Sequence, residues 1–112
     1  MDTEENIELL KEIRQLDEQE ENLRYAGRIL NELEEEEQEN LKNSFYLQAD
    51  LAARYGGDVK VSSLLDENRW LLKKSEVAKE EIFQDTKSFI REKIEAGEEQ
   101  KQSYREALEK AD

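Results

Sequence analysis

The feature that most constrains this chain is a single break near its centre. The segment Tyr55-Gly56-Gly57-Asp58 interrupts a sequence of 112 residues that contains no proline and only two other glycines. Paired glycines permit positive φ and end helices, whereas a proline-free chain rich in Glu, Leu, Lys, Ala and Gln favours long helices. We therefore predict a single domain, residues 1–112, in which two helices flank this turn.

The predicted boundaries follow from that break. We expect a first helix over about residues 3–55, a turn over about 56–62, and a second helix over about 63–111. Helices of this length are typical of coiled-coil-like packing, and a short connection makes them antiparallel neighbours. The predicted fold class is all-α, an antiparallel two-helix hairpin with long coiled-coil-like helices.

The start of the second helix carries candidate capping residues. The β-branched segment 59–61 is short enough to be a connector. Ser62 or Ser63 would then be the N-cap, with Asp66 three residues after Ser63 as a weak form of the capping box.

The apolar residues have helical spacing but are unevenly distributed. In the first helix, steps of three and then seven predict an inward stripe that begins with Ile7, Leu10, Ile13, Leu16 and Leu23. Four consecutive glutamates, residues 34–37, then fill a helical turn with charge. In the second helix, alternating steps of four and three predict a heptad seam at Ile90, Ile94, Gly97, Lys101, Tyr104 and Leu108, interrupted by Lys101.

The half of the chain nearest the turn has more apolar residues than one two-helix seam can cover. Isolated two-helix hairpins also bury little surface, so both observations predict a helical partner or a second copy of the chain. The only tryptophan could fill the core or anchor a partner. The expected partner-binding apolar face comprises Phe45, Leu51, Leu65, Trp70, Leu72 and Phe83.

Charge limits the classes of partner. The chain has 30 acidic and 17 basic residues, a formal net charge of −13, which repels the phosphates of nucleic acids. Residues 1–57 carry most of the excess acid, and lysines of the second helix are expected to neutralise part of the Glu32–Glu39 block. We predict no nucleic-acid binding, and keep an acidic nucleic-acid mimic as one alternative function.

The chain offers little for catalysis. It contains no histidine and no cysteine, which removes the commonest general base, the thiol nucleophile and the usual zinc ligands. No apolar run reaches the length of a membrane span, and the first residues are acidic, unlike a signal peptide. We therefore expect no enzymatic activity, no cofactor or metal, no signal peptide and no membrane insertion.

The hairpin proportions and the aromatic-x-Gly turn Tyr55-Gly56-Gly57 resemble the WXG-type proteins of type VII secretion in Gram-positive bacteria. The run Leu64-Leu65-Asp66-Glu67-Asn68-Arg69, followed by Trp70-Leu71-Leu72, is similar more specifically to the LXG-associated α-helical proteins. These small proteins are encoded beside LXG toxins.

This resemblance implies a non-enzymatic targeting factor, or chaperone, that binds the helical LXG domain of an effector toxin together with a second small helical protein. Type VII substrates often end helix 2 with an aromatic-x-x-x-acid signal, but Tyr104 is followed by Leu108 at that spacing. The resemblance thus implies a cytoplasmic protein that is exported, if at all, with its partner. A homo-oligomeric structural coiled coil is the other main alternative.

Overall fold

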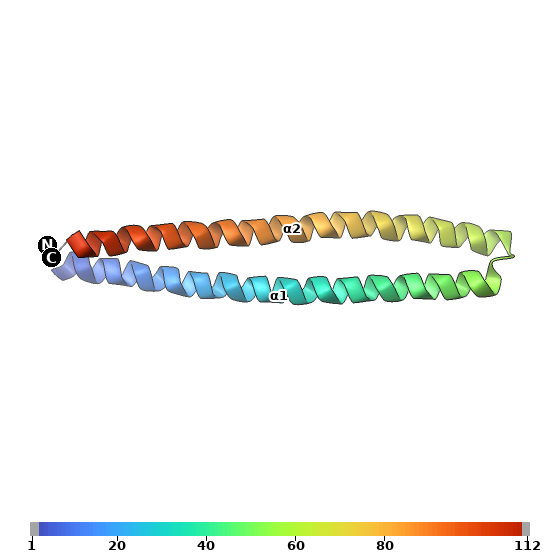
Figure 1. Ribbon diagram of the computed structural model, residues 1–112, viewed down its shortest axis with the longest axis horizontal. Coiled ribbons are helices and arrows are strands. Elements are labelled where there is room, and N and C mark those ends of the chain that lie inside the picture. The colour runs from blue at the N-terminus through green and yellow to red at the C-terminus, as the bar shows by residue number, and fades with distance from the viewer. Residues whose placement is uncertain (1–2, 111–112) are drawn as a thin grey trace. The chain divides into compact units, whose positions relative to one another are not determined.

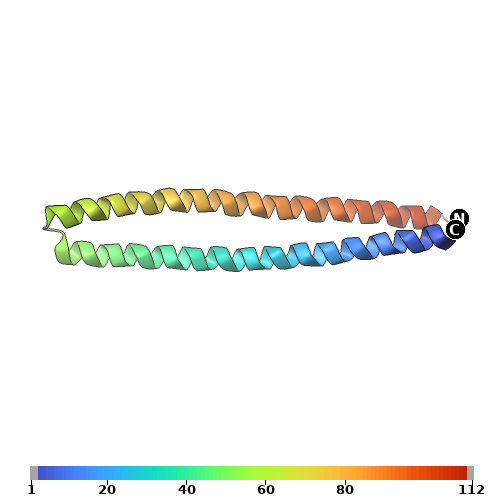
Figure 2. The same ribbon diagram turned by 180° about the vertical axis from the view of Figure 1, so that it is seen from behind.

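The computed structural model describes residues 3–110 and contains two helices, α1 (Thr3–Tyr55) and α2 (Val59–Lys110), of 53 and 52 residues. No strand occurs within these residues. The predicted all-α helical hairpin is confirmed, and Figure 2 shows the same pair of helices from behind (Figures 1 and 2). The expected end of the second helix at residue 111 lies outside the described residues.

The hairpin divides into two compact units. The turn unit comprises Leu30–Asp85 and contains the reversal of the chain, while the terminal unit contains the described residues 3–29 and 86–110. Within each unit a stretch of α1 and a stretch of α2 lie side by side and run antiparallel (Figure 1). Each unit is therefore a two-helix layer held by its own side-chain contacts.

The second helix begins at Val59, not near residue 63, so the turn is shorter than predicted. The N-cap is Asp58, whose Oδ1 accepts hydrogen bonds from the backbone N–H groups of Lys60 (2.9 Å) and Val61 (3.1 Å). A carboxylate in this position satisfies two of the N–H groups that a helix start leaves without partners. This cap outweighs the weak helix preference of the β-branched residues.

The serines that we expected to cap α2 lie inside its first turns. The backbone N–H of Ser62 donates to the carbonyl of Asp58 at 2.9 Å, which is the first hydrogen bond of the helix. Ser63 is an exposed helical residue. The predicted cap at Ser62 or Ser63 is therefore wrong.

The two turn glycines have different roles. Neither has a positive φ, although glycine permits one. A Cβ atom at Gly56 would collide with the backbone carbonyl oxygen of Ala52, whereas a Cβ atom at Gly57 would meet nothing within 4 Å. The N–H of Asp58 donates to the Tyr55 carbonyl at 3.0 Å and closes the turn. Gly56 is therefore required for space, not for a left-handed conformation.

The inward positions of α1 alternate in steps of three and four. They are Asn6, Leu9, Ile13, Leu16, Glu20, Leu23 and Gly27 in the terminal unit, and Leu30, Glu34, Glu37, Leu41, Ser44, Gln48 and Leu51 in the turn unit. We call these positions and the α2 residues that face them the seam. Ile7 and Leu10, which we expected to point inward, are 48% and 55% exposed. Repeated steps of three fall short of a full helical turn of 3.6 residues, so they drift away from the seam.

The predicted heptad seam of α2 is confirmed. Its members from Ile90 to Leu108 are all half-buried, apart from Lys101, which is buried. Within residues 3–110 no apolar side chain is buried, and the only buried residues are Gln48 and Lys101, each 5% exposed. The hairpin therefore lacks a dry apolar core.

Lys101 is the centre of a polar cluster in the terminal unit. Its Nζ lies 2.8 Å from Asp17 Oδ1 and 3.6 Å from Glu20 Oε2 on α1. The hydrogen bond to Lys101 holds the pKa of Asp17 below its usual range, and the same bond raises the pKa of Lys101. A buried ammonium with these partners disfavours any slip of one helix along the other.

We expect Gly56→Ala to lower the free energy of unfolding by about 1–3 kcal/mol, because the added methyl group forces the backbone near Ala52 to shift. The matched variant Gly57→Ala should leave stability unchanged or raise it by about 0.5 kcal/mol, because it stiffens only the unfolded chain. Urea unfolding followed by circular dichroism measures both. Equal effects of the two variants would contradict the assigned role of Gly56.

We expect the terminal unit to lose stability on acidification below about pH 4. Since the pKa of Asp17 is lowered on folding, its contribution is present above its unfolded pKa and disappears as the pH falls through the folded one. Lys101 acts in the opposite sense: its contribution is lost only as the pH rises through its raised pKa.

The test is a series of thermal melts across the acidic range. Asp17→Asn should flatten the acid limb of the stability curve, while the control Asp66→Asn, on an exposed part of α2, should leave it unchanged. An unaltered acid limb in Asp17→Asn would show that this ion pair does not contribute.

Candidate partner-binding groove

The six residues that we expected to form one apolar face lie on two different faces. Leu51, Leu65, Leu72 and Phe83 are half-buried along the seam, and Phe45 is half-buried beside it. Trp70, in contrast, is 60% exposed and points away from the seam. The apolar residues of α2 are close together in sequence, so they were interpreted as one broad face. The heptad spacing of the seam places Leu72 on the inner side of the helix and Trp70 on the outer side.

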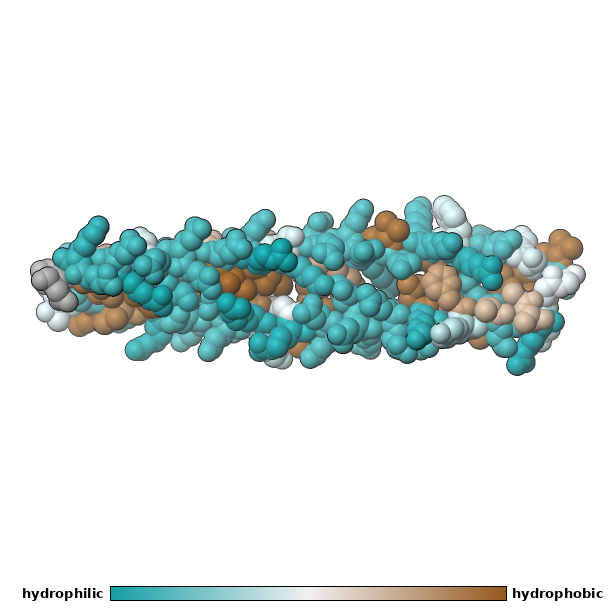
Figure 3. Space-filling model, in the orientation of Figure 1, coloured by the Kyte–Doolittle hydropathy of each residue, from teal (hydrophilic) through white to brown (hydrophobic). Residues whose placement is uncertain are grey.

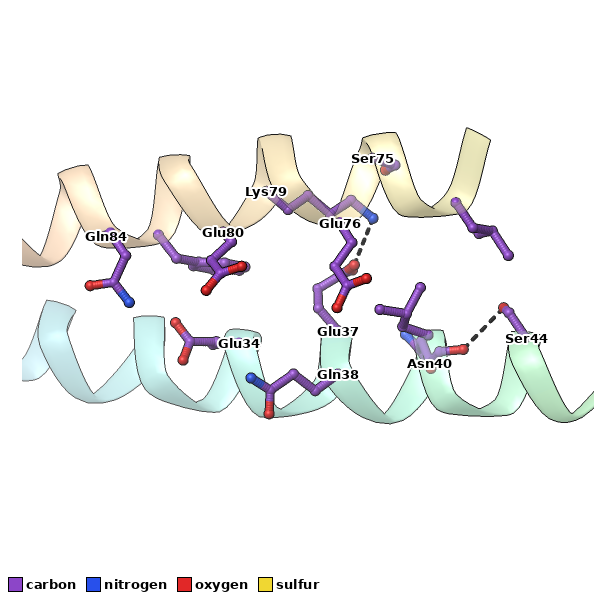
Figure 4. Close-up of a pocket in the computed structure, with 13 residues that line it drawn as sticks. Glu34, Glu37, Gln38, Asn40, Ser44, Ser75, Glu76, Lys79, Glu80 and Gln84 are labelled. Atoms are coloured by element: carbon purple, nitrogen blue, oxygen red, sulfur yellow. Dashed lines mark hydrogen bonds and ion pairs between the residues drawn. The ribbon is translucent and has the colours of Figure 1, made fainter. Parts of the chain in front are cut away.

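A groove lies between α1 and α2 in the turn unit. It encloses a cavity of about 250 Å³ and is lined by residues of both helices (Figure 4). Its apolar lining comes from Leu41, Leu72 and Phe83, two of which belong to the predicted partner-binding set. In this part of the seam, α1 presents the half-buried Glu34 and Glu37 where apolar side chains would otherwise pack against α2.

The polar lining of the groove is strongly acidic. It includes Glu34, Glu37, Glu76 and Glu80, and its one cationic residue is Lys79. Lys79 Nζ lies 2.7 Å from Glu37 Oε2, as drawn in Figure 4. Both side chains are about half exposed, so this ion pair adds well under about 1 kcal/mol to stability.

The expected neutralisation of the Glu32–Glu39 block by lysines is therefore present at Lys79. Lys74, another lysine of α2, lies over the ring of Trp70, with its Nζ 5.0 Å from the ring centroid. The groove keeps an excess of carboxylates. A partner that enters it is best matched by apolar side chains flanked by basic ones.

Gln48 is a seam residue that sequence reasoning missed. Its Nε2 donates to Asn68 Oδ1 at 2.7 Å, linking α1 to α2. Its Oε1 is buried and has no hydrogen-bond partner. The signal that could have identified it is the regular three-and-four spacing from Leu41 through Ser44 to Gln48.

The remaining predicted site residues form the turn. Tyr55 is exposed at the end of α1, while Gly56 and Gly57 reverse the chain and Asp58 caps α2. In the described part of the chain, no group of three or more His, Cys, Asp or Glu residues is placed to hold a metal ion. Neither α1 nor α2 combines the length and the apolar character that a bilayer span needs.

Comparison with known proteins gives no relationship: no family model, curated protein or solved structure matches this chain.

We expect Gln48→Met to raise the free energy of unfolding by about 1 kcal/mol, because it removes a buried acceptor that has no partner while keeping the volume of the side chain. Asn68→Ala is the matched variant. It leaves both polar atoms of Gln48 unpaired and should lower stability by about 1 kcal/mol. Chemical unfolding measures both, and a loss of stability in Gln48→Met would contradict this reading.

Proposed function

We propose that this chain is a non-enzymatic adaptor that binds a helical segment of another protein in the groove of the turn unit. The observation that carries the proposal is the composition of the groove: Leu41, Leu72 and Phe83 are framed by four glutamates. An amphipathic helix that lies between α1 and α2 would bury these apolar side chains and add the third helix that the seam lacks. Basic residues beside its apolar stripe would face the glutamates.

Apolar residues of α1 that lie outside the lining of the groove are also exposed. Leu33, Tyr46 and Leu47, in the turn unit, are 48%, 63% and 60% exposed. Since no apolar side chain of residues 3–110 is buried, much of the apolar surface of the isolated chain stays in contact with water. Burial of that surface against a partner supplies the driving force for association.

We further propose, from the sequence resemblance, that the partner is the helical LXG domain of a type VII secretion effector, bound together with a second small helical protein. In this role the chain delivers the effector to the secretion apparatus from the cytoplasm and leaves the cell only with its partner. The groove supports helix binding in general, and the identity of the partner rests on Tyr55-Gly56-Gly57 and on the run from Leu64 to Leu72.

The proposal is tested with a purified LXG domain from an effector encoded in the same genome. We expect the wild-type chain to bind it with a dissociation constant that rises with salt, because the carboxylates of the groove are screened. Phe83→Glu, in the groove, should weaken binding at least about 100-fold, as expected for a charge introduced at the centre of a helix interface.

Phe89→Glu is the matched control, because Phe89 is an exposed phenylalanine of α2 outside the groove. It should leave the affinity for the LXG domain within about twofold. Absence of binding by the wild-type chain would overturn the identity of the partner. Equal losses in the two variants would overturn the location of the site.

A further inference from the structure

The outer face of α2 in the turn unit carries a second apolar stripe. Leu64, Trp70, Leu71 and Val77 are 57%, 60%, 52% and 57% exposed, and none of them lines the groove. Along the edge formed by α2, hydrophobic side chains are visible at the surface (Figure 3). A surface helix normally places charged residues on the face opposite its seam, so this apolar face needs an explanation.

The stripe has an ordered pattern of charge. Residues seven apart lie on nearly one line along a helix, because two turns take 7.2 residues. One such line on the outer face of α2 reads Lys60, Glu67, Lys74, Glu81, with alternating signs. On the helical geometry this line runs between two apolar lines. One contains Leu64 and Leu71, and the other contains Trp70 and Val77.

The two central charges have no opposite charge beside them on α2. The residues three and four positions away from Glu67 are Ser63, Leu64, Trp70 and Leu71, and those around Lys74 are Trp70, Leu71, Val77 and Ala78. These are the positions at which helical ion pairs form. The ammonium of Lys74 instead lies over the ring of Trp70. Any ion-pair partner for Glu67 or Lys74 on this face would therefore come from another molecule.

We propose that the outer face of α2 is a homodimer interface, in which the α2 helices of two copies pack antiparallel about a two-fold axis between Trp70 and Leu71. Such an axis places two residues of different copies at the same level when one precedes the axis by as many positions as the other follows it. Glu67 then meets Lys74 of the second copy, and Lys60 meets Glu81. Each of these ion pairs occurs twice by symmetry.

The apolar residues obey the same symmetry. The axis keeps each apolar line facing the same line of the second copy. Trp70 therefore lies within one residue's rise of Trp70 of the second copy on one side of the charged line, and Leu71 lies as close to Leu71 on the other. With the same offset, Leu64 faces Ala78 and Ser63 faces Val77 of the second copy. Two-fold interfaces are self-complementary by construction, since the same surface is used twice. Binding of an unrelated protein would not require the charges and apolar residues of α2 to be symmetric about Trp70 and Leu71. The symmetry therefore favours a second copy of this chain as the partner.

The corresponding outer positions of α1 do not allow the same association. They carry Glu32, Glu35, Glu36 and Glu39, which are exposed and of one sign. Two copies would repel each other there. The proposed self-association therefore uses the outer face of α2. It uses a face separate from the groove and does not depend on the function proposed above.

The first test is the mass of the full-length chain in solution. We expect sedimentation equilibrium from about 1 µM to about 200 µM to show a reversible monomer–dimer equilibrium, with dimer favoured by concentration. Trp70 is the only tryptophan, so its emission should shift to shorter wavelength over the same range. A monomer at every concentration, with constant Trp70 emission, would overturn the proposal.

Charge reversal tests the predicted pairing. Glu67→Lys and Lys74→Glu should each weaken the dimer at least about tenfold, because each places like charges opposite one another twice. An equimolar mixture of the two variants should recover a dimer, since every facing pair in that heterodimer is again of opposite sign. The double variant Glu67→Lys/Lys74→Glu should also dimerise as the wild-type chain does.

Glu35→Lys, on the outer side of α1, is the control and should leave the dimer unchanged. A dimer that persists unaltered in both single variants would place the interface elsewhere. Failure of the mixture to recover the dimer would overturn the two-fold arrangement about Trp70 and Leu71. Because these measurements use the purified chain alone, they do not depend on whether an LXG domain binds in the groove.

Discussion

The structure depends on a seam that buries charge and amide groups but no complete apolar side chain among the described residues. Lys101 is buried beside Asp17 in the terminal unit, and Gln48 is buried beside Asn68 in the turn unit. Burial of such groups contributes little net stability, because the cost of removing them from water offsets the attraction. Their geometric demands are strict, however, so each fixes which residues of α1 and α2 are paired within its unit.

This choice of seam residues explains where the two proposed association surfaces lie. Leu72 and Phe83 are only half-buried, since α1 presents Glu34 and Glu37 beside Leu41, its one apolar residue in the lining. Apolar surface is left at the groove, where its acidic frame suits a basic amphipathic helix. On the outer face of α2, Trp70 and Leu71 flank charges of alternating sign, which suits a copy of the same helix. The charges of the groove would therefore favour a basic helix of another protein, whereas those of the outer face of α2 would favour a second copy of this chain.

The pattern along the chain predicted the architecture well because helix formation is decided by local preferences. A chain without proline, with one glycine pair at its centre, can be two long helices and little else. The seam of α2 from Ile90 to Leu108 was also predictable, because its steps of four and three are unbroken. The residue at which α2 starts was not predictable from the sequence. Ser62, Ser63 and Asp58 are all good caps, and only the backbone path at Gly56 determines which of them meets free N–H groups.

The sequence by itself determined the fold class, the position of the turn and the acidic character of the first helix, since these follow from residue preferences and charge. Only the tertiary structure decided which apolar residues face inward. Trp70 and Leu72 are two positions apart, and a helix of 3.6 residues per turn sends them to different faces. The alignment of α1 against α2 then made one of them part of the groove and the other part of the outer stripe. That alignment is set by contacts such as Gln48 with Asn68, between residues far apart in sequence.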